Sequence, residues 1–524
     1  MPLSYYQPDR QKRDGQHLHA DLCIYGATSA GVMAAVEGAR RNLSVVLLAN
    51  TRHVGGLAAS GLGYTDFGDF SIIGGLAAEF YRRAGAHYGV EREWRIEPGV
   101  AQKLFAGFLR EADVEPIPFQ YLDTVKVENG RIMSIRMESG LEVRAGHYID
   151  ATYEGDLMAK ANVPHTVGRE GNAKYGELLN GVQVYDQHQF ELPVSPYVRE
   201  GDPGSGLLPG IDPEPLAPLG SGDKRVQAYN FRMCLTRARD RIVFEKPDGY
   251  DPLNYELLAR YLRGGWSQTF RKFDMIRGGK TDVNNHGAFS SDYIGASHMY
   301  PESSYAGREL IFQEHVNHVR GLFWFYCNDP RVPAGLQMEM RRWGLAADEF
   351  ADSGHWPPQL YVREARRMVS DYVVTEHDCR GYRRADDVVG YGAYGMDSHN
   401  CRRVVVDGRV LNEGDVQYGG EPPYPISYRA VVPPRKSVSN LFVPVCVSAS
   451  HIAFGSIRME PVFMILAQSC AIAAALCKQR NCDAQDLPYE ALKPSLEESA
   501  QIISYNPPRM FYPPSELREE MTLA

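Results

Sequence analysis

Residues 21–36 read DLCIYGATSAGVMAAV. An apolar run at 22–25 ends at Gly26, small residues continue to Gly31, and an alanine-rich helical pattern precedes a second apolar run at 45–48. The order strand, glycine turn, helix, strand is the unit that holds a dinucleotide pyrophosphate at a helix N-terminus. Gly26 permits the tight turn, and Gly31 lets the helix pack close to the strand. The stretch therefore predicts an α/β fold with a Rossmann-type nucleotide-binding unit.

The turn departs from the usual fingerprint at one position. The central glycine of G-x-G-x-x-G is Thr28, so an ordinary β-α turn is the alternative interpretation. Ala30, Ala34 and Gly38 recur every fourth residue and give the helix a flat face for close packing. The surrounding strand-turn-helix-strand order favours a nucleotide site.

Composition narrows the class of protein. The chain has 524 residues, 44% hydrophobic and 23% charged, with a net charge of -9, which disfavours nucleic acid and anionic membranes as partners. The most apolar segment, 462–477, is interrupted by Gln468 and Ser469, so we expect a buried helix and no membrane span. The N-terminus lacks a signal-peptide pattern, and nine cysteines show no metal or C-x-x-C spacing, which suggests reduced thiols in the cytoplasm.

The pattern along the chain divides it into regions. We predict an N-terminal tail at 1–19, a Rossmann-type domain split between 20–170 and 430–482, an inserted α+β substrate domain at 171–429, and a C-terminal segment at 483–524. The insert lacks β-α rhythm and is rich in proline, tyrosine and tryptophan.

Local signals place several elements within these regions. We expect helices at 74–88, 99–112 and from near Pro461, a hairpin turn at Asn129-Gly130, strands at 146–151 and 441–447, and a loop at 448–458.

Four motifs, in order along the chain, carry a family resemblance. They lie at 26–32, 52–57, 150–156 and 456–461. The chain resembles the FAD-dependent oxidoreductases of the glutathione-reductase-like fold, in the branch that reads G-G-T-x-A-G-V, R-H-x-G-G-x, D-A-T-Y-E-G-D and S-I-R-M-E-P. Segments at 280–295, 360–372 and 396–400 also resemble that branch, so the similarity covers roughly residues 20–480.

The resemblance implies FAD as the cofactor and a set of contacts to it. It implies that Gly26, Thr28 and Gly31, with Ala30, line the pyrophosphate. It also implies a second group of contacts along the rest of the cofactor: Gly55, Gly56 and Ser60 near the ribityl chain and phosphates, the backbone of Val125 at the adenine, Asp156 closing the site, and Arg52, His53 and Arg458 as further contacts.

A helix that starts near Glu460 and Pro461 would point its N-terminus at the flavin pyrimidine. Unpaired N–H groups there suit the negative charge of reduced flavin.

The end of the second strand departs from the family pattern. Relatives place Glu or Asp there to bind the adenosine ribose, whereas this chain has Ala49 followed by Asn50. Asn50 or Thr51 could contact the ribose instead. His53 precedes the glycine loop, where a covalent FAD link is the alternative to a polar contact.

A second literal G-x-G-x-x-G at 390–395 is followed by no helix, so we expect a glycine-rich loop and no NAD(P)H domain. We therefore expect dioxygen or another acceptor to reoxidise the flavin. The sequence leaves a monomer or a homo-oligomer open.

Catalysis needs a group that takes a proton during hydride transfer, and histidine suits this role near neutral pH. His451 is the first candidate because its loop leads into the flavin-facing helix; His399, beside Asp397, and His286 are next. Taken alone, each of these histidines is more often structural than catalytic.

Arg363 and Arg367 are four residues apart, which predicts a shared helix face. They could clamp a carboxylate or oxygen-rich substrate, and Arg363 could act as an acid in a reductase. The alternative is a structural ion-pair network with Glu364 and Asp371.

These observations predict an FAD enzyme that dehydrogenates an alcohol carbon of a sugar, polyol or similar small molecule by hydride transfer to flavin N5. One alternative is a flavin-linked C–C or C–N dehydrogenase or reductase of a carboxylate-bearing substrate. Another is a non-redox lyase that retains FAD structurally.

Overall fold

A computed structural model describes residues 3–10, 12–420 and 422–505. Its main feature is a seven-stranded sheet in which the strands follow the order β3-β2-β1-β6-β5-β4, with β19 also paired to β6. The strand bounds are β1 His17–Tyr25, β2 Val45–Leu48, β3 Pro116–Ile117, β4 Leu122–Glu128, β5 Arg131–Met137, β6 Glu142–Asp150 and β19 Leu441–Phe442. The predicted mixed α/β fold with parallel strands is confirmed.

The parallel part of the sheet brings distant segments to one edge. Strands β3, β2, β1, β6 and β19 run parallel, with Tyr25 opposite both Leu48 and Asp150. The carboxyl ends of these strands therefore face the same side, where ligands bind in open α/β sheets. The last residues of β1, β2 and β6 all meet at this edge.

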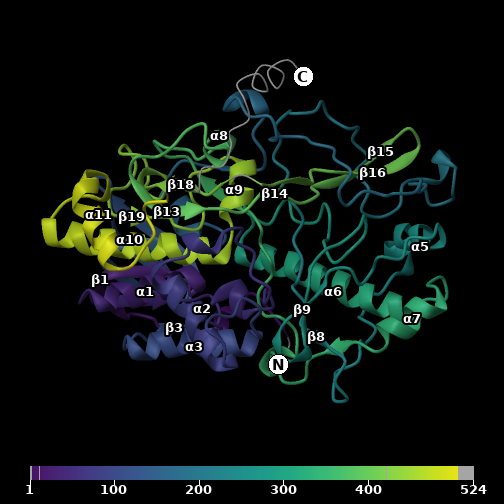
Figure 1. The fold of residues 1–524 in the computed structure, drawn as a ribbon, viewed down its shortest axis with the longest axis horizontal. Coiled ribbons are helices and arrows are strands. Elements are labelled where there is room, and N and C mark those ends of the chain that lie inside the picture. Colours follow the sequence, from purple (N-terminus) through teal and green to yellow (C-terminus); the bar gives the residue numbers. More distant parts are fainter. Residues whose placement is uncertain (1–2, 11, 421, 506–524) are drawn as a thin grey trace.

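Helices cover the sheet at one end of the molecule (Figure 1). Helix α1 (Ser29–Arg40) packs on α10 (Glu460–Arg480), and α2 (Gly75–Tyr88) and α3 (Pro98–Glu111) lie beside them. Ala34 and Ala471 are fully buried, as their small-residue spacing predicts. The last helix of the described chain is α11 (Tyr489–Glu498).

The predicted hairpin turn is present. Asn129 and Gly130 have φ angles of 49° and 73°, the left-handed conformation that a tight hairpin requires. Glu128 pairs with Arg131 across the turn.

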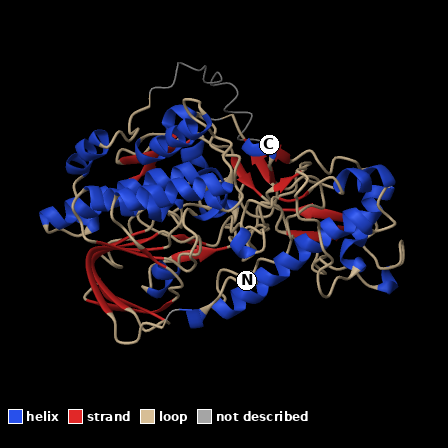
Figure 2. Ribbon diagram, turned by 90° about the horizontal axis from the view of Figure 1, so that it is seen from below, coloured by secondary structure: helices blue, strands red, loops and turns tan. Residues whose placement is uncertain are grey.

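Residues 171–429 form a different kind of structure, with long loops and two-stranded sheets (Figure 2). The long helix α6 (Tyr305–Asn328) crosses this half of the molecule. Its neighbours along the chain are α5 Glu256–Arg263, α7 Ala334–Met340, α8 Glu376–Cys379, β8 Leu235–Thr236, β9 Phe273–Met275, β10 Thr281–Val283, β11 Gly344–Leu345, β12 Arg366–Met368, β13 Val388–Gly392, β14 Met396–Ser398, β15 Arg402–Val406, β16 Arg409–Glu413, β17 Val416–Tyr418 and β18 Tyr424–Ser427. Two short elements, α4 Asp156–Lys160 and β7 His165–Val167, precede residue 171 in the chain.

Three local predictions were wrong in detail. The expected loop at 448–458 contains helix α9 (His451–Ile457), because the Ser450 hydroxyl accepts a hydrogen bond from the Ala453 N–H and caps it. Strand β19 ends at Phe442, five residues before the predicted end at Val447. The glycine-rich segment at 390–395 begins within strand β13, where Gly390 lets Ile465 pack against the backbone.

Among the described residues, one helix, α10, is long and apolar enough to cross a membrane. However, 89% of that apolar window is buried in the protein, as expected for a core helix. All nine cysteines are unpaired, and eight of them are buried.

Candidate functional site

The turn between β1 and α1 is wound too tightly for larger residues. Gly26 has a φ of 105°, and a Cβ on Gly31 would lie 1.8 Å from the Gly26 carbonyl oxygen. The Thr28 hydroxyl accepts a hydrogen bond from the Gly31 N–H. The N–H groups of Ser29 and Ala30 have no partner within the helix, because they belong to its first turn. This end of α1 can therefore receive an anionic group.

A second glycine turn lies directly beside the first. Gly55 pairs with Thr28, and the Gly55 N–H donates to the Ala27 carbonyl oxygen. Gly56 has a φ of 54° and begins a short 3-10 helix, η2 (Gly56–Ala59). The next residue, Ser60, is buried. The structure thus brings Gly26, Thr28 and Gly55 together, as a pyrophosphate-binding loop pair requires.

The N-terminus of α10 meets the same place. Pro461 occupies the first turn, and no side chain caps the helix. The Glu460 carboxyl group contacts the Ser29 hydroxyl and accepts a hydrogen bond of 2.8 Å from Tyr153. Burial raises the pKa of Glu460 to about 7. Two helix N-termini and small-residue turns fit a dinucleotide such as FAD, with its diphosphate at α1.

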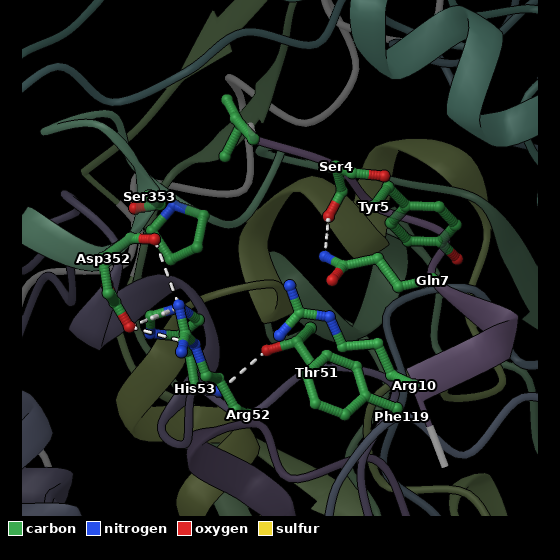
Figure 3. A pocket seen from close by; sticks show the side chains of 12 residues that line it. Ser4, Tyr5, Gln7, Arg10, Thr51, Arg52, His53, Phe119, Asp352 and Ser353 are labelled. Carbon is green, nitrogen blue, oxygen red and sulfur yellow. Dashed lines mark hydrogen bonds and ion pairs between the residues drawn. The ribbon is translucent and has the colours of Figure 1, made fainter. Parts of the chain in front are cut away.

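A small pocket lies beyond the ends of β2 and β3 (Figure 3). Thr51, Arg52 and His53 line it together with residues of the N-terminal segment. The carboxylate of Asp352 lies 3.0 Å from Arg52 Nε and 3.6 Å from His53 Nε2. Burial lowers the pKa of His53, although the charge of Asp352 opposes this shift. Asn50 precedes these residues and is the second residue after β2.

Two further predicted FAD contacts, Val125 and Asp156, lie outside the two glycine turns. Val125 lies in the β4–β5 hairpin and pairs with Ile135, so β5 and β6 separate its strand from β1 in the sheet. Asp156 starts α4, and its carboxylate lies 2.6 Å from Arg308 and 2.8 Å from Arg366. Burial alone would raise the pKa of Asp156, but these arginines lower it to about 2.

A larger cavity of 340 Å³ lies where the second half of the chain meets the loop before α10. Its wall is mostly polar. The polar residues that line it are Asp66, His188, Arg232, Lys272, Asn284, Asn285, Tyr361, Tyr394, Asp397, His399, Gln417, Tyr418 and Arg458. Met459 also lines it and is the residue directly before α10.

His399 lies in this cavity between two carboxylates. Its Nδ1 atom is 3.1 Å from Asp292 Oδ2, and its Nε2 atom is 3.6 Å from Asp397 Oδ2. Burial alone would raise the pKa of both aspartates, but His399 and neighbouring arginines lower each to about 2. The imidazole is thus held by fixed negative charge on both sides.

Arg458, predicted as an FAD contact, forms part of the wall of this cavity. Its guanidinium donates hydrogen bonds of 2.8 Å to the Tyr361 hydroxyl and 3.0 Å to Asp397 Oδ2. Arg458 thus connects the carboxylate beside His399 to the segment that enters α10.

The predicted helix carrying Arg363 and Arg367 is not present. Residues 360–365 form no helix and lead into β12, which pairs with β7. The arginines instead find separate buried partners: Arg363 lies 2.8 Å from Asp292, and Arg367 pairs with Glu170 and Glu364. Helix propensity yields here to buried ion pairing, so the two side chains form no shared clamp.

His451 is held in a different environment from His399. It is 2% exposed, and its Nδ1 atom lies 2.7 Å from Glu364 Oε2. Burial, together with the charge of Arg367, lowers the pKa of His451 to about 3. Among the described residues that line the 340 Å³ cavity, His399 is present and His451 is not.

His286 bonds Gln268 through Nε2 at 3.0 Å and contributes to another, smaller pocket.

Sequence reasoning missed several residues of the cavity. Asp292 lies within the segment 280–295 and was not singled out, although it joins Arg363 to His399. Asp66 also faces the cavity, and its burial raises its pKa to about 6. The available signal was that segments 280–295 and 396–400 both resemble the same family, since both contribute to this cavity.

Comparison with known proteins identifies a family. The model of the FAD dependent oxidoreductase family matches residues 21–496. Among curated proteins, none matches the sequence.

Several solved structures resemble parts of the chain. One is a 3-ketosteroid-delta4-(5alpha)-dehydrogenase from Rhodococcus jostii RHA1, with 16% identity and a TM-score of 0.20. The match covers 31% of this chain and 53% of the dehydrogenase. An L-proline dehydrogenase from P. horikoshii matches with 14% identity, a TM-score of 0.24 and 29% and 59% coverage. An L-amino acid deaminase from Proteus vulgaris matches with 14% identity, a TM-score of 0.23 and 32% and 55% coverage. Each match spans between half and two thirds of the other protein.

Proposed function

The chain belongs to the FAD dependent oxidoreductase family and is an FAD-dependent enzyme, and we propose that it dehydrogenates an alcohol carbon of a sugar, polyol or similar oxygenated small molecule. We place it in the branch with the G-G-T-x-A-G-V, R-H-x-G-G-x, D-A-T-Y-E-G-D and S-I-R-M-E-P motifs. The proposed domains are a split FAD-binding domain at 20–170 and 430–482 and a substrate domain at 171–429.

The proposed FAD site uses the two glycine turns and the two helix N-termini. The N–H groups of Ser29 and Ala30 face the position that a diphosphate would take, and Gly55 and Gly56 allow close approach of their backbone. In place of the absent carboxylate at Ala49, Asn50 or Thr51 would bind the adenosine ribose.

The observation that carries the proposed substrate class is the polarity of the 340 Å³ cavity. Thirteen of its lining residues carry polar side chains, and the volume lies within the range of small-molecule sites. Each hydroxyl of a polyol needs a hydrogen-bond partner when it leaves water, and this wall supplies donors and acceptors of both kinds. A large apolar substrate would leave these groups unpaired.

His399 is the proposed proton acceptor of the reaction. When bound, FAD supplies the oxidant for the alcohol carbon, and the protein supplies the base that takes the hydroxyl proton. Asp292 lies at Nδ1 of His399 and Asp397 lies near Nε2, and the two carboxylates fix the orientation of the ring. Arg458 holds Asp397 in place from the other side.

A second candidate function rests on the cations of the same cavity. Lys272 and Arg458 line it, so a substrate carboxylate could bind there during C–C or C–N dehydrogenation or reduction. Arg458 already bonds Asp397, Arg232 pairs with Asp282 at 2.6 Å, and Lys272 lies 3.5 Å from Asp274, so a substrate carboxylate would share these cations with aspartates of the protein.

The test is anaerobic titration of the purified holoenzyme with sugars, polyols, hydroxy acids and amino acids, followed by the visible spectrum of the flavin. Bleaching by a sugar or polyol supports the proposal. Bleaching only by amino acids or other carboxylates would favour the second candidate. A flavin that dithionite reduces but no compound bleaches would contradict both and favour a non-redox role.

We further propose a cytoplasmic enzyme whose flavin is reoxidised by dioxygen or another acceptor.

A further inference from the structure

Two paired strands form one wall of the 340 Å³ cavity. Strands β14 and β17 run antiparallel, with Asp397 opposite Gln417 and Ser398 opposite Val416. Alternate residues of a strand face the same side, so Asp397 and Gln417 share one face of this ribbon. Cβ atoms of such cross-strand neighbours lie about 4.5–5.5 Å apart. His399 directly follows Ser398 and Asp415 directly precedes Val416, so both lie at this end of the ribbon.

A second histidine–carboxylate pair lies on this face. His188 Nδ1 is 2.8 Å from Asp415 Oδ2, and the two side chains are 13% and 2% exposed. The amide nitrogens of Asn285 and Gln417 each lie 3.4 Å from the same Nδ1 atom. The other ring nitrogen of His188, Nε2, has no hydrogen-bond partner in the described part of the chain, although the residue lines the cavity.

The backbone holds His188 in an uncommon conformation. Its φ is 52°, in the left-handed region that a few per cent of non-glycine residues adopt and in which Asn, Asp and His are enriched. The Asn412 side chain donates a hydrogen bond of 2.8 Å to the His188 carbonyl oxygen and fixes this turn. Such strain persists where surrounding contacts enforce it and often marks functional positions.

We propose that His188, oriented by Asp415, binds a second hydroxyl group of the substrate, on a carbon near the one whose hydroxyl proton His399 accepts. The inference rests on the proposed function, because it assigns the substrate two neighbouring oxygens in the same cavity. Asp415 holds Nδ1 of His188, so Nε2 is the ring nitrogen that binds the substrate hydroxyl. His188 is thus a specificity-determining residue, and the substrate class narrows to compounds with at least two hydroxyl groups.

The experiment measures binding to oxidised holoenzyme, so that it does not depend on turnover. The probes are D-glucose and its 2-, 3-, 4- and 6-deoxy analogues, titrated against the flavin absorbance spectrum of wild type and His188→Asn. Asparagine tolerates a positive φ, so the turn is retained. His377→Asn is the matched control, because His377 bonds the Tyr175 carbonyl oxygen at 3.1 Å in another pocket. Thermal melts verify that each variant is folded.

We expect wild type and His377→Asn to lose about ten-fold in affinity for one deoxy sugar. His188→Asn should bind glucose and that analogue equally well, and Asp415→Asn should lose part of the discrimination. Equal discrimination by wild type and His188→Asn would overturn the inference, as would wild type that binds all five sugars alike or none. Discrimination by His188 without anaerobic flavin reduction would support this subsite and contradict the proposed oxidation.

Discussion

The Nδ1 atom of His399 lies 3.1 Å from Oδ2 of Asp292, although 107 positions separate the two residues in the chain. Asp292 also accepts a hydrogen bond of 2.8 Å from Arg363 through its other oxygen. The aspartate therefore joins a buried arginine to an imidazole in the cavity wall. A histidine fixed at one nitrogen by a carboxylate has a defined orientation at the other, which a proton acceptor requires.

Replacement of His399 should remove the proposed base. We expect His399→Asn to slow anaerobic flavin reduction by about 100-fold or more, as is usual for the loss of a general base. FAD content should not change, because His399 lies outside the glycine turns. Stopped-flow absorbance with the substrate found by titration measures the rate, with His377→Asn as control. A normal rate would exclude His399 as the base.

Loss of the Asp292 carboxylate should act through His399. We expect Asp292→Asn to lower kcat by about ten-fold or more while KM changes little, because the base loses its orientation but the rest of the cavity remains. The pH profile of kcat should shift as well, which a purely structural role would not cause. Asp248→Asn, an exposed aspartate, provides the control. Equal losses of activity and stability with an unshifted pH profile would contradict the positioning role.

His451 should contribute more to stability than to proton transfer. Its pKa of about 3 makes it a weak proton acceptor at neutral pH, and its Nδ1 bonds the buried Glu364. We expect His451→Ala to lower the free energy of unfolding by about 1–3 kcal/mol, because Glu364 loses a partner. Flavin reduction should remain within a few-fold of wild type. A loss of about 100-fold in reduction rate with unchanged stability would make His451 the base instead.

The sequence predicted those parts of the structure that local chemistry controls. The turn from Gly26 to Gly31 and the hairpin at Asn129-Gly130 depend on glycine conformations that neighbouring residues require. The segment around Arg363 was predicted as a helix from the four-residue spacing of Arg363 and Arg367, but buried ion pairs hold it in a non-helical conformation. Such pairs cannot be read from spacing.

Most of the cavity also depends on long-range pairing. His188 and Asp415 lie 227 positions apart, and their contact depends on how the loop at His188 packs against Asn412 and the residues that follow it. His399 was singled out through its neighbour Asp397, which the structure does place beside it. Its closer partner Asp292 comes from another segment. A single sequence contains the residue types of such a site but no information on which strands pair.

The tight turn at Gly31 should be essential for FAD binding. A Cβ at this position would lie 1.8 Å from the Gly26 carbonyl oxygen, so Gly31→Ala must open the turn that faces the diphosphate. We expect at least about a 100-fold loss of FAD affinity, measured by flavin fluorescence during titration of apoprotein. Gly38→Ala is the control on the same helix, because its Cβ would meet only side-chain methyl groups of Leu22, Val45 and Leu43. Full FAD content in Gly31→Ala would contradict the proposed site.

Glu154 should make stability fall with rising pH in a defined window. Its carboxyl group accepts a hydrogen bond of 3.0 Å from Tyr300, and burial raises its pKa from 4.5 to about 7, with Asp156 adding to the shift and Arg308 opposing it. Between these values the native state holds a proton that the unfolded chain releases, so the stability contribution is complete below pH 4.5 and is lost as pH rises through 7.

The Glu154→Gln variant lacks this titration and provides the reference for its size. Relative to Glu154→Gln, wild type should lose at most about 3 kcal/mol of unfolding free energy between pH 4.5 and pH 8. Urea unfolding of both proteins at pH 4.5 and pH 8 measures the difference. Because the glutamine keeps the shape and the polar contact to Tyr300, a difference that is independent of pH would show that Glu154 is ionised in the native protein throughout this range.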